Sequence, residues 1–309
     1  MLSLPTTGIS RSISTHNVDL DTICDWIEAT VLFDEEELSQ SDICDTLIEE
    51  NIYENQDMAF YIISSAWSEI RKRQSWLGEG TPFNITSNRI SRLLNWKNVS
   101  AHSFCLILSI SKYYRGWTEQ FGSDYTEQGE LFEQLAKESL EQQFKDWEIL
   151  LTGWSSKNAT GIKQLVSDIA SKLGESVGNV SRWTSESRKD AELDILFYRP
   201  FKDQRVGIPV FLMQCASGRN WETKRHTPNL KLWTKIIDFA VTPTKAFAIP
   251  YAIVDKSFVE NCNLVDGLFL DRYRILAATN YKKKWISKSL KARLVNWLKP
   301  RINALPRSH

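Results

Sequence analysis

The residues best suited to chemistry lie in two apolar runs between Lys189 and Lys224. Asp194 begins the first run, and Gln214 stands near the end of the second. Magnesium prefers oxygen ligands and keeps several of its waters, so one or two carboxylates with neutral oxygens are enough to hold it. The residue types therefore indicate a site for a hard divalent cation at the ends of two neighbouring strands.

Such a site usually has a cationic side chain two positions after the polar residue of the second strand, which here is Gln214. That position is Ala216, which can neither orient a water nor stabilise developing negative charge. Lys224 is the leading replacement, because its long side chain can reach back from the following loop. Arg219 is a second candidate, although a guanidinium acts as a charge clamp rather than as a base. The alternative is that Lys224 is an ordinary solvated lysine.

The elements that must position these residues follow a helix and strand alternation. Helices are expected over Asp124 to Phe144, Gly161 to Leu173 and Pro228 to Phe239, and strands over Trp147 to Thr152, Leu193 to Tyr198, Pro209 to Cys215 and Ala246 to Val254. This order predicts an α/β fold with a mixed central sheet flanked by helices.

The first third of the chain has a different pattern. Apolar residues recur there at three and four positions, which predicts helices such as Met58 to Arg73, Ser87 to Trp96 and Ala101 to Trp117. The run FCLILSI at 104–110 is expected to be a buried helix. We therefore predict an N-terminal all-helical accessory domain at 1–120, a core at 121–260 and a basic helical extension at 261–309.

Three residues carry a resemblance to a known family. Glu133 in the G-E-L-F-E helix, Asp194 and Gln214 together resemble the core of the PD-(D/E)XK, or restriction-endonuclease-like, nuclease superfamily. Members of its Mrr-like group are similar in having glutamine on the third strand. The resemblance covers about residues 125–255. It implies a metal-dependent endonuclease that hydrolyses phosphodiester bonds of DNA with Mg²⁺ or Mn²⁺.

The resemblance also implies roles for individual residues. Asp194 would supply the essential carboxylate, and the side-chain oxygen of Gln214 or the main-chain carbonyl of Cys215 would be a neutral ligand. Glu133 would hold a water of the metal from the facing helix. Phosphate would be positioned by the turn that follows the third strand, through Ser217, Arg219 and Asn220.

Other acidic residues compete for these roles. Asp190 would share a face with Asp194 in an extended segment, and Glu130 lies one turn from Glu133. Glu175 follows the helix expected at Gly161 to Leu173. Cys215 is expected to be a buried thiol rather than a nucleophile, because no histidine is paired with it. A protein of a different class also remains open, namely a catalytically inactive nucleic-acid-binding or scaffold subunit.

Charge is distributed unevenly along a chain of zero formal net charge. Asn17 to Asp57 contains fourteen acidic residues and no lysine or arginine, whereas Tyr281 to His309 contains nine basic residues and no acidic one. Lys288, Lys291 and Arg293 lie in an amphipathic pattern whose basic face would contact nucleic acid or simply be solvated. The acidic segment would dock a partner, such as a motor ATPase or a defence-complex subunit, or be a solvated face.

Composition limits the remaining classes. The chain has 309 residues, 42% hydrophobic and 25% charged, which is ordinary for a globular protein. Five cysteines without paired spacing indicate reduced thiols and no zinc site. No apolar run is long enough to cross a membrane, so a cytoplasmic location is expected.

The run Q-C-A-x-G-x-N-W is similar to uncharacterised bacterial proteins of antiphage defence loci, which implies an antiviral effector. Homo-oligomer formation stays open.

Overall fold

The computed structural model describes the chain except for residues 10–17, 122–124, 153–160, 185–190, 279–283 and 309. The chain forms two compact units. The first comprises Met1–Asp124, Pro250–Val254 and Arg272–His309, and the second comprises Tyr125–Ile249 and Asp255–Asp271. The sequence predicts a separate extension at 261–309, whereas the residues from Arg272 onward belong to the first unit.

The first unit is built mainly of helices packed around α1. Its elements are α1 (Leu20–Phe33), β1 (Glu37–Ser39), α2 (Gln40–Glu49), α3 (Gln56–Leu77), the 3₁₀ turn η1 (Gly78–Gly80), β2 (Phe83–Ile85), β3 (Arg89–Arg92), α4 (Ser100–Ser111), α5 (Arg115–Phe121), α11 (Arg272–Leu276) and α12 (Lys288–Asn303). Every residue of α4 is buried, so the expected buried helix at 104–110 is confirmed. The helix expected at 58–73 is also confirmed, within α3.

The expectation that this region is all-helical is wrong. Strands β1, β3 and β2 form an antiparallel three-stranded sheet, in which Ile90 pairs with Leu38 and Ile85. The helix expected at 87–96 is therefore a short strand. Ile90 is the one fully buried residue of β3, and so short a strand gives no alternating pattern. Leu93 and Leu94 fall three and four positions after Ile90, which imitates helical spacing.

A network of charged side chains lies inside the first unit. Asp25 of α1 is 1% exposed and receives two hydrogen bonds from the guanidinium of Arg272, at 2.8 and 3.2 Å. Arg73 of α3 bonds the same carboxylate at 3.1 Å and lies 3.5 Å from Glu28, which also accepts a hydrogen bond from Tyr273 at 3.2 Å. We call Asp25, Glu28, Arg73 and Arg272 the buried charge network. It joins α1, α3 and α11.

Burial and charge act in opposite directions on this network. Burial disfavours the charged form of Asp25, but Arg272 and Arg73 outweigh it and lower its pKa to about 2. Burial dominates at Glu28 and raises its pKa. His102 of α4 lies beside Glu28, and burial together with the charge of Arg272 lowers its pKa to about 3. Neither ring nitrogen of His102 has a hydrogen-bond partner among the described residues, so this histidine is held neutral.

The C-terminal helix α12 packs by its apolar face and leaves its basic face in solvent. Leu290, Leu294 and Trp297 are buried, and the Trp297 ring contacts Phe104 of α4 edge-on, with centroids 5.0 Å apart. The basic residues predicted to contact nucleic acid are exposed on this helix: Lys288, Lys291 and Arg293. Beyond α12, Arg307 donates a hydrogen bond to Asp34 at 2.6 Å. The basic C-terminal segment and the acidic N-terminal segment therefore contact each other at this pair.

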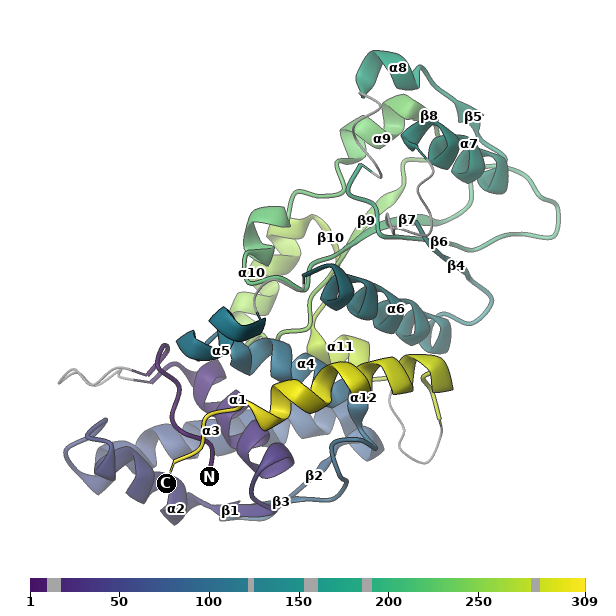
Figure 1. The fold of residues 1–309 in the computed structure, drawn as a ribbon. Helices are drawn as coiled ribbons and strands as arrows, with labels where there is room; N and C mark the ends of the chain where they lie inside the picture. Colours follow the sequence, from purple (N-terminus) through teal and green to yellow (C-terminus); the bar gives the residue numbers. More distant parts are fainter. Residues whose placement is uncertain (10–17, 122–124, 153–160, 185–190, 279–283, 309) are drawn as a thin grey trace. The chain divides into compact units, whose positions relative to one another are not determined.

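The second unit contains a mixed five-stranded sheet flanked by helices (Figure 1). Its elements are α6 (Tyr125–Gln143), β4 (Glu148–Leu151), α7 (Ile162–Leu173), β5 (Ser176–Val177), α8 (Val180–Trp183), β6 (Ile195–Tyr198), β7 (Val210–Cys215), the 3₁₀ turn η2 (Trp221–Lys224), α9 (Leu230–Ile236), β8 (Ile237–Asp238), β9 (Thr244–Ala248), α10 (Asp255–Val265) and β10 (Gly267–Leu270). The strand order is β10-β9-β7-β6-β4. Strand β6 pairs antiparallel with both β4 and β7, while β9 runs parallel to β7 and to β10. The predicted mixed α/β sheet is confirmed.

Alternating side chains of β6 and β7 build two apolar layers. Leu196 and Leu212 pack with residues of α7 and α9. On the α6 side, Phe197 and Phe211 stack in parallel, with centroids 4.6 Å apart, and Phe144 packs against Phe197. Because β6 and β7 are antiparallel and Ile195 pairs with Met213, the start of β6 lies beside the end of β7. The sheet therefore brings the residue before Ile195 next to the residue after Met213.

Two further expectations concern cysteine and membrane association. All five cysteines are free thiols, and four of them are buried: Cys24, Cys44, Cys105 and Cys215. Among the described helices, none combines the length and the apolar character needed to cross a bilayer.

Candidate functional site

Asp194 enters the sheet through a constrained turn. Ala191 and Glu192 both have left-handed backbone conformations, with φ of +48° and +62°, which non-glycine residues seldom adopt in succession. Asp194 then donates its own backbone N–H to Met213 at 2.9 Å, one residue before β6 begins. The turn fixes a carboxylate at the entry of a buried strand, where its side chain is 7% exposed.

Gln214 and Cys215 meet this carboxylate from the end of β7. The Cys215 backbone N–H donates to Asp194 Oδ2 at 2.6 Å, and the Gln214 amide donates to the same oxygen. On its other side, Gln214 Oε1 accepts a hydrogen bond from the Thr227 hydroxyl at 3.4 Å. Burial raises the pKa of the Cys215 thiol, and the negative charges of Asp194 and Glu133 raise it further. Cys215 is thus held as a neutral thiol, as the sequence predicts.

One face of α6 forms the facing wall. Tyr125, Gly129 and Glu133 all line the same pocket as Asp194, and they recur at intervals of four residues. The adjacent Gln128 fixes this helix to the turn after β7, because its amide donates to the Ser217 carbonyl at 2.9 Å and to the Ser217 hydroxyl at 3.3 Å. Glu133 is therefore held on the side of α6 that faces the strand ends.

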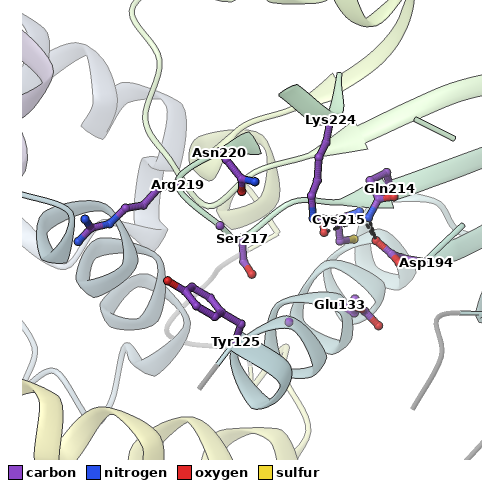
Figure 2. A pocket seen from close by; sticks show the side chains of 11 residues that line it. Tyr125, Glu133, Asp194, Gln214, Cys215, Ser217, Arg219, Asn220 and Lys224 are labelled. Atoms are coloured by element: carbon purple, nitrogen blue, oxygen red, sulfur yellow. Dashed lines mark hydrogen bonds between the residues drawn. The ribbon is translucent and has the colours of Figure 1, made fainter. Parts of the chain in front are cut away.

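Lys224 completes the pocket from η2. Figure 2 shows its side chain extending toward Gln214 and Cys215, whereas Arg219 points toward the opposite end of the pocket. The Lys224 ammonium has no hydrogen bond or ion pair with any residue that the structure describes. A cation without a partner that lines a pocket beside carboxylates is available to an anionic ligand. We call Glu133, Asp194, Gln214 and Lys224 the pocket cluster.

The pocket has a volume of about 570 Å³, and its lining comes entirely from the second unit. It brings together eight residues that the sequence analysis singles out: Glu133, Asp194, Gln214, Cys215, Ser217, Arg219, Asn220 and Lys224. Lys288, Lys291 and Arg293 do not line it and belong to the first unit.

The competing acidic residues are placed elsewhere. Glu130 does not line the pocket, although it lies on the same helix as Glu133. Glu175 accepts the backbone N–H of Ala240 at 3.2 Å, next to the small β5 and β8 pair. Asp190 lies outside the described residues. Of the described alternatives, only Glu133 shares the pocket with Asp194.

The donor atoms of the pocket suit a hard cation in kind. No group of three or more His, Cys, Asp or Glu residues is placed to hold a metal within the described parts of the chain. The pocket offers two carboxylates, Asp194 and Glu133, with neutral oxygens of Gln214 and Cys215. Magnesium retains waters and can be held by one or two carboxylates, so these residues fit it. Their negative charge is smaller than that of three carboxylates, and the Gln214 amide competes for Asp194.

Sequence reasoning missed four residues that shape the site, one of which is Gly218 in the pocket lining. Tyr125 and Gly129 line the pocket, and Thr227 orients Gln214. The first two had a readable signal, because they precede Glu133 by eight and four positions on the same helical face. Thr227 had none, since its contact with Gln214 depends on how the chain returns after η2.

No family model, curated protein or solved structure matches this chain. The function must therefore be argued from the site itself.

Proposed function

We propose that this protein is a metal-dependent nuclease of the PD-(D/E)XK kind that hydrolyses phosphodiester bonds of DNA. One observation carries the proposal: the ammonium of Lys224, which has no partner among the described residues, lines the same pocket as Asp194, Gln214 and Glu133. The missing lysine at Ala216 is the main objection to this chemistry. A cation that reaches the pocket from η2 would answer it, because catalysis requires a positive charge at the reacting group and not at a particular sequence position.

The order of elements supports the same proposal. The resemblance depends on a helix carrying the glutamate, followed by three strands, a helix and a fourth strand. Helix α6, strands β4, β6 and β7, helix α9 and strand β9 follow in that order. Asp194 and Gln214 lie at adjoining ends of β6 and β7, which is where polar groups from both strands can act on one ligand.

The residues of the pocket would divide the chemistry among them. A bound Mg²⁺ or Mn²⁺ ion would supply neutralisation of phosphoryl charge and a lower pKa for the attacking water. Asp194 and Glu133 would hold that ion, with the oxygens of Gln214 and Cys215 as neutral ligands. Lys224 would stabilise the negative charge that develops on the phosphoryl group. Gln214 and the Cys215 N–H also keep the Asp194 carboxylate in one orientation.

A cleavage assay tests the proposal. Supercoiled and linear DNA are incubated with the protein and magnesium or manganese, beside Asp194→Ala and the control Glu175→Gln. The wild type and the control should cleave, EDTA should stop both, and Asp194→Ala should lose roughly 10³-fold in rate, since the metal's charge stabilisation is worth several kcal/mol. Cleavage by folded Asp194→Ala at the wild-type rate would contradict the proposal.

A second candidate is a catalytically inactive nucleic-acid-binding or scaffold subunit. It is favoured by the hydrogen bonds at Asp194, whose Oδ2 atom already accepts two protein donors. In that case Asp194 would be a structural group that joins β6 to β7. Binding of DNA without cleavage in either metal would select this candidate, and metal-dependent cleavage that requires Asp194 would exclude it.

The third proposal concerns the cellular role. We propose an effector of bacterial antiphage defence, with a motor ATPase or defence-complex subunit docked on the acidic part of the first unit. The docking surface would have to exclude Asp25 and Glu28, which are buried. Glu35, Glu36 and Glu37 remain exposed, and a triple lysine substitution there should abolish co-purification of a genuine partner.

A further inference from the structure

The lining face of α6 combines an exposed ring, a gap and a carboxylate. Tyr125, Gly129 and Glu133 are separated by four residues each, which corresponds to steps of about 6 Å along a helix. Tyr125 is 59% exposed although it lines the pocket. In Figure 2 its ring lies with Ser217 and Arg219 at one end, while Asp194, Gln214 and Lys224 lie at the other. The pocket therefore extends well beyond the atoms that would do the chemistry.

Gly129 keeps the middle of this face open. Glycine inside a helix costs about 1 kcal/mol relative to alanine, so its presence calls for a reason. The backbone does not require it, because Gly129 is not among the residues with positive φ. Packing does not require it either, since within the described parts of the chain an added Cβ would meet only Glu133 Oε1, at 3.9 Å. What the missing side chain preserves is free space between the Tyr125 ring and the Glu133 carboxylate.

The pocket also presents polar groups that have no partner in the described part of the chain. Among the described residues, neither the Tyr125 hydroxyl nor the Asn220 side-chain amide makes a hydrogen bond. Asn220 Oδ1 lies close to Gly218, where a Cβ would approach it to 3.0 Å. A ring and an amide that line one pocket, without partners among the described residues, suit a flat heterocycle with hydrogen-bonding edges. The pocket volume of about 570 Å³ falls in the range of small-ligand sites.

We propose that this end of the pocket binds one unpaired nucleotide, whose base stacks on Tyr125 and faces Asn220 while its phosphate lies toward Lys224. The inference rests on the proposed function and names its substrate class, single-stranded nucleic acid. Bases inside a duplex are covered on both faces by their neighbours, so away from a duplex end the Tyr125 ring can stack only on an unpaired base. Gly129 leaves room for the sugar between the base and the reacting phosphate.

Equilibrium binding tests the inference without requiring cleavage. Fluorescein-labelled single strands of DNA and of RNA, and a blunt DNA duplex of the same length, are titrated with wild-type protein in EDTA and with Asp194→Ala in magnesium. Fluorescence anisotropy should show at least tenfold tighter binding of a single strand than of the duplex. The DNA and RNA arms identify which sugar the pocket accepts.

Variants of the α6 face assign the preference to this site. Tyr125→Ala should weaken single-strand binding about 5- to 100-fold, while Tyr125→Phe should restore it, because stacking needs the ring. Tyr61→Ala, at a tyrosine that is 74% exposed on α3, is the matched control and should bind like the wild type. Gly129→Leu should weaken binding by filling the gap, whereas Gly129→Ala should fold at least as stably as the wild type.

The outcomes separate this inference from the proposed function. Equal affinity for single strand and duplex, or wild-type binding by Tyr125→Ala, overturns the inference even if the protein cleaves DNA. Tyr125-dependent binding of a single strand by a protein that never cleaves supports the inference and removes the hydrolytic function. Faster cleavage of single strands that is lost in Tyr125→Ala supports both.

Discussion

Two clusters of charged residues in this protein have opposite properties. In the buried charge network, Asp25, Glu28, Arg73 and Arg272 are at most 2% exposed, and each charge faces an opposite charge within 3.6 Å. In the pocket cluster, Lys224 has no partner among the described residues and the side chains line a cavity.

The difference separates structural from chemical roles. Charges that are matched and sealed from solvent have a structural role, because no ligand can reach them and the loss of one partner leaves the other buried and uncompensated. A cation and carboxylates that share an open pocket without neutralising one another can act on a ligand. Both clusters contain acidic residues, so acidic residues alone would not distinguish them. The distinguishing feature is that the cation of the pocket cluster, Lys224, lines a cavity.

The largest expected effect tests the structural side of the comparison. Arg272→Met should lower the free energy of unfolding by about 3–5 kcal/mol, because it leaves the Asp25 carboxylate buried without its bidentate partner. Denaturant unfolding measures the loss. Arg274→Met, at an exposed position of the same helix, should stay within about 0.5 kcal/mol of the wild type. Equal stability of the two variants would show that the network contributes no more than surface charges.

His102 gives a pH-dependent test of the same interior. Its pKa in the folded protein is about 3, below the ordinary value of 6.5. The unfolded chain therefore binds a proton below pH 6.5 that the folded protein refuses, and stability falls as pH drops from 6.5 to about 3. Relative to wild type, His102→Leu should gain stability in this window by up to about 1.4 kcal/mol per pH unit.

The comparison with wild type is necessary because other groups titrate in the same range. Burial raises the pKa of Asp21 to about 6, so Asp21 contributes stability of the opposite sign as the pH falls. At pH 7 the leucine variant should be close to wild type in stability, since neither ring nitrogen of His102 has a hydrogen bond to lose among the described residues. His226→Leu, at an exposed histidine, should leave the wild-type pH dependence in place. Parallel profiles for wild type and His102→Leu would contradict a neutral buried histidine.

A smaller effect tests the chemical side. Gln214→Glu adds a carboxylate next to Asp194 and should tighten magnesium binding about tenfold, because affinity for hard cations grows with the charge of the ligands. Isothermal titration of magnesium into each protein measures the change. Gln164→Glu, on the exposed side of α7, is the matched control. An unchanged magnesium affinity in Gln214→Glu would place the cation away from β7.

The sequence predicts much of the second unit, because strand and helix patterns there are long enough to read. It correctly indicates β6, which Asp194 immediately precedes, and β7, which contains Gln214, although it misses β10, a strand of four residues that begins two positions after the end of α10. It fails at the buried charge network. Asp25 and Arg272 are far apart in the chain, and an acidic segment without lysine or arginine is typical of a solvated surface. Its neutralising arginines come from elsewhere and are recognisable only after folding.

In the pocket, too, the sequence predicts some of the contacts and leaves others open. The residue types and the strand pattern predict that Asp194 and Gln214 approach each other, since neighbouring antiparallel strands bring such positions together. Their hydrogen bond agrees with this. The sequence leaves Lys224 open between a site residue and a solvated lysine, because the path of η2 determines where its side chain extends.

The central claim is that Lys224, without a partner among the described residues, makes the pocket cluster a chemical site. The most direct measurement compares DNA cleavage by Lys224→Ala and Lys235→Ala at saturating magnesium. Lys235 belongs to the same unit but lies over the Trp183 ring at 3.8 Å, outside the pocket. We predict that Lys224→Ala cleaves about 100-fold more slowly while unfolding at the wild-type midpoint, and that Lys235→Ala cleaves normally. Cleavage by folded Lys224→Ala at the wild-type rate would contradict the claim.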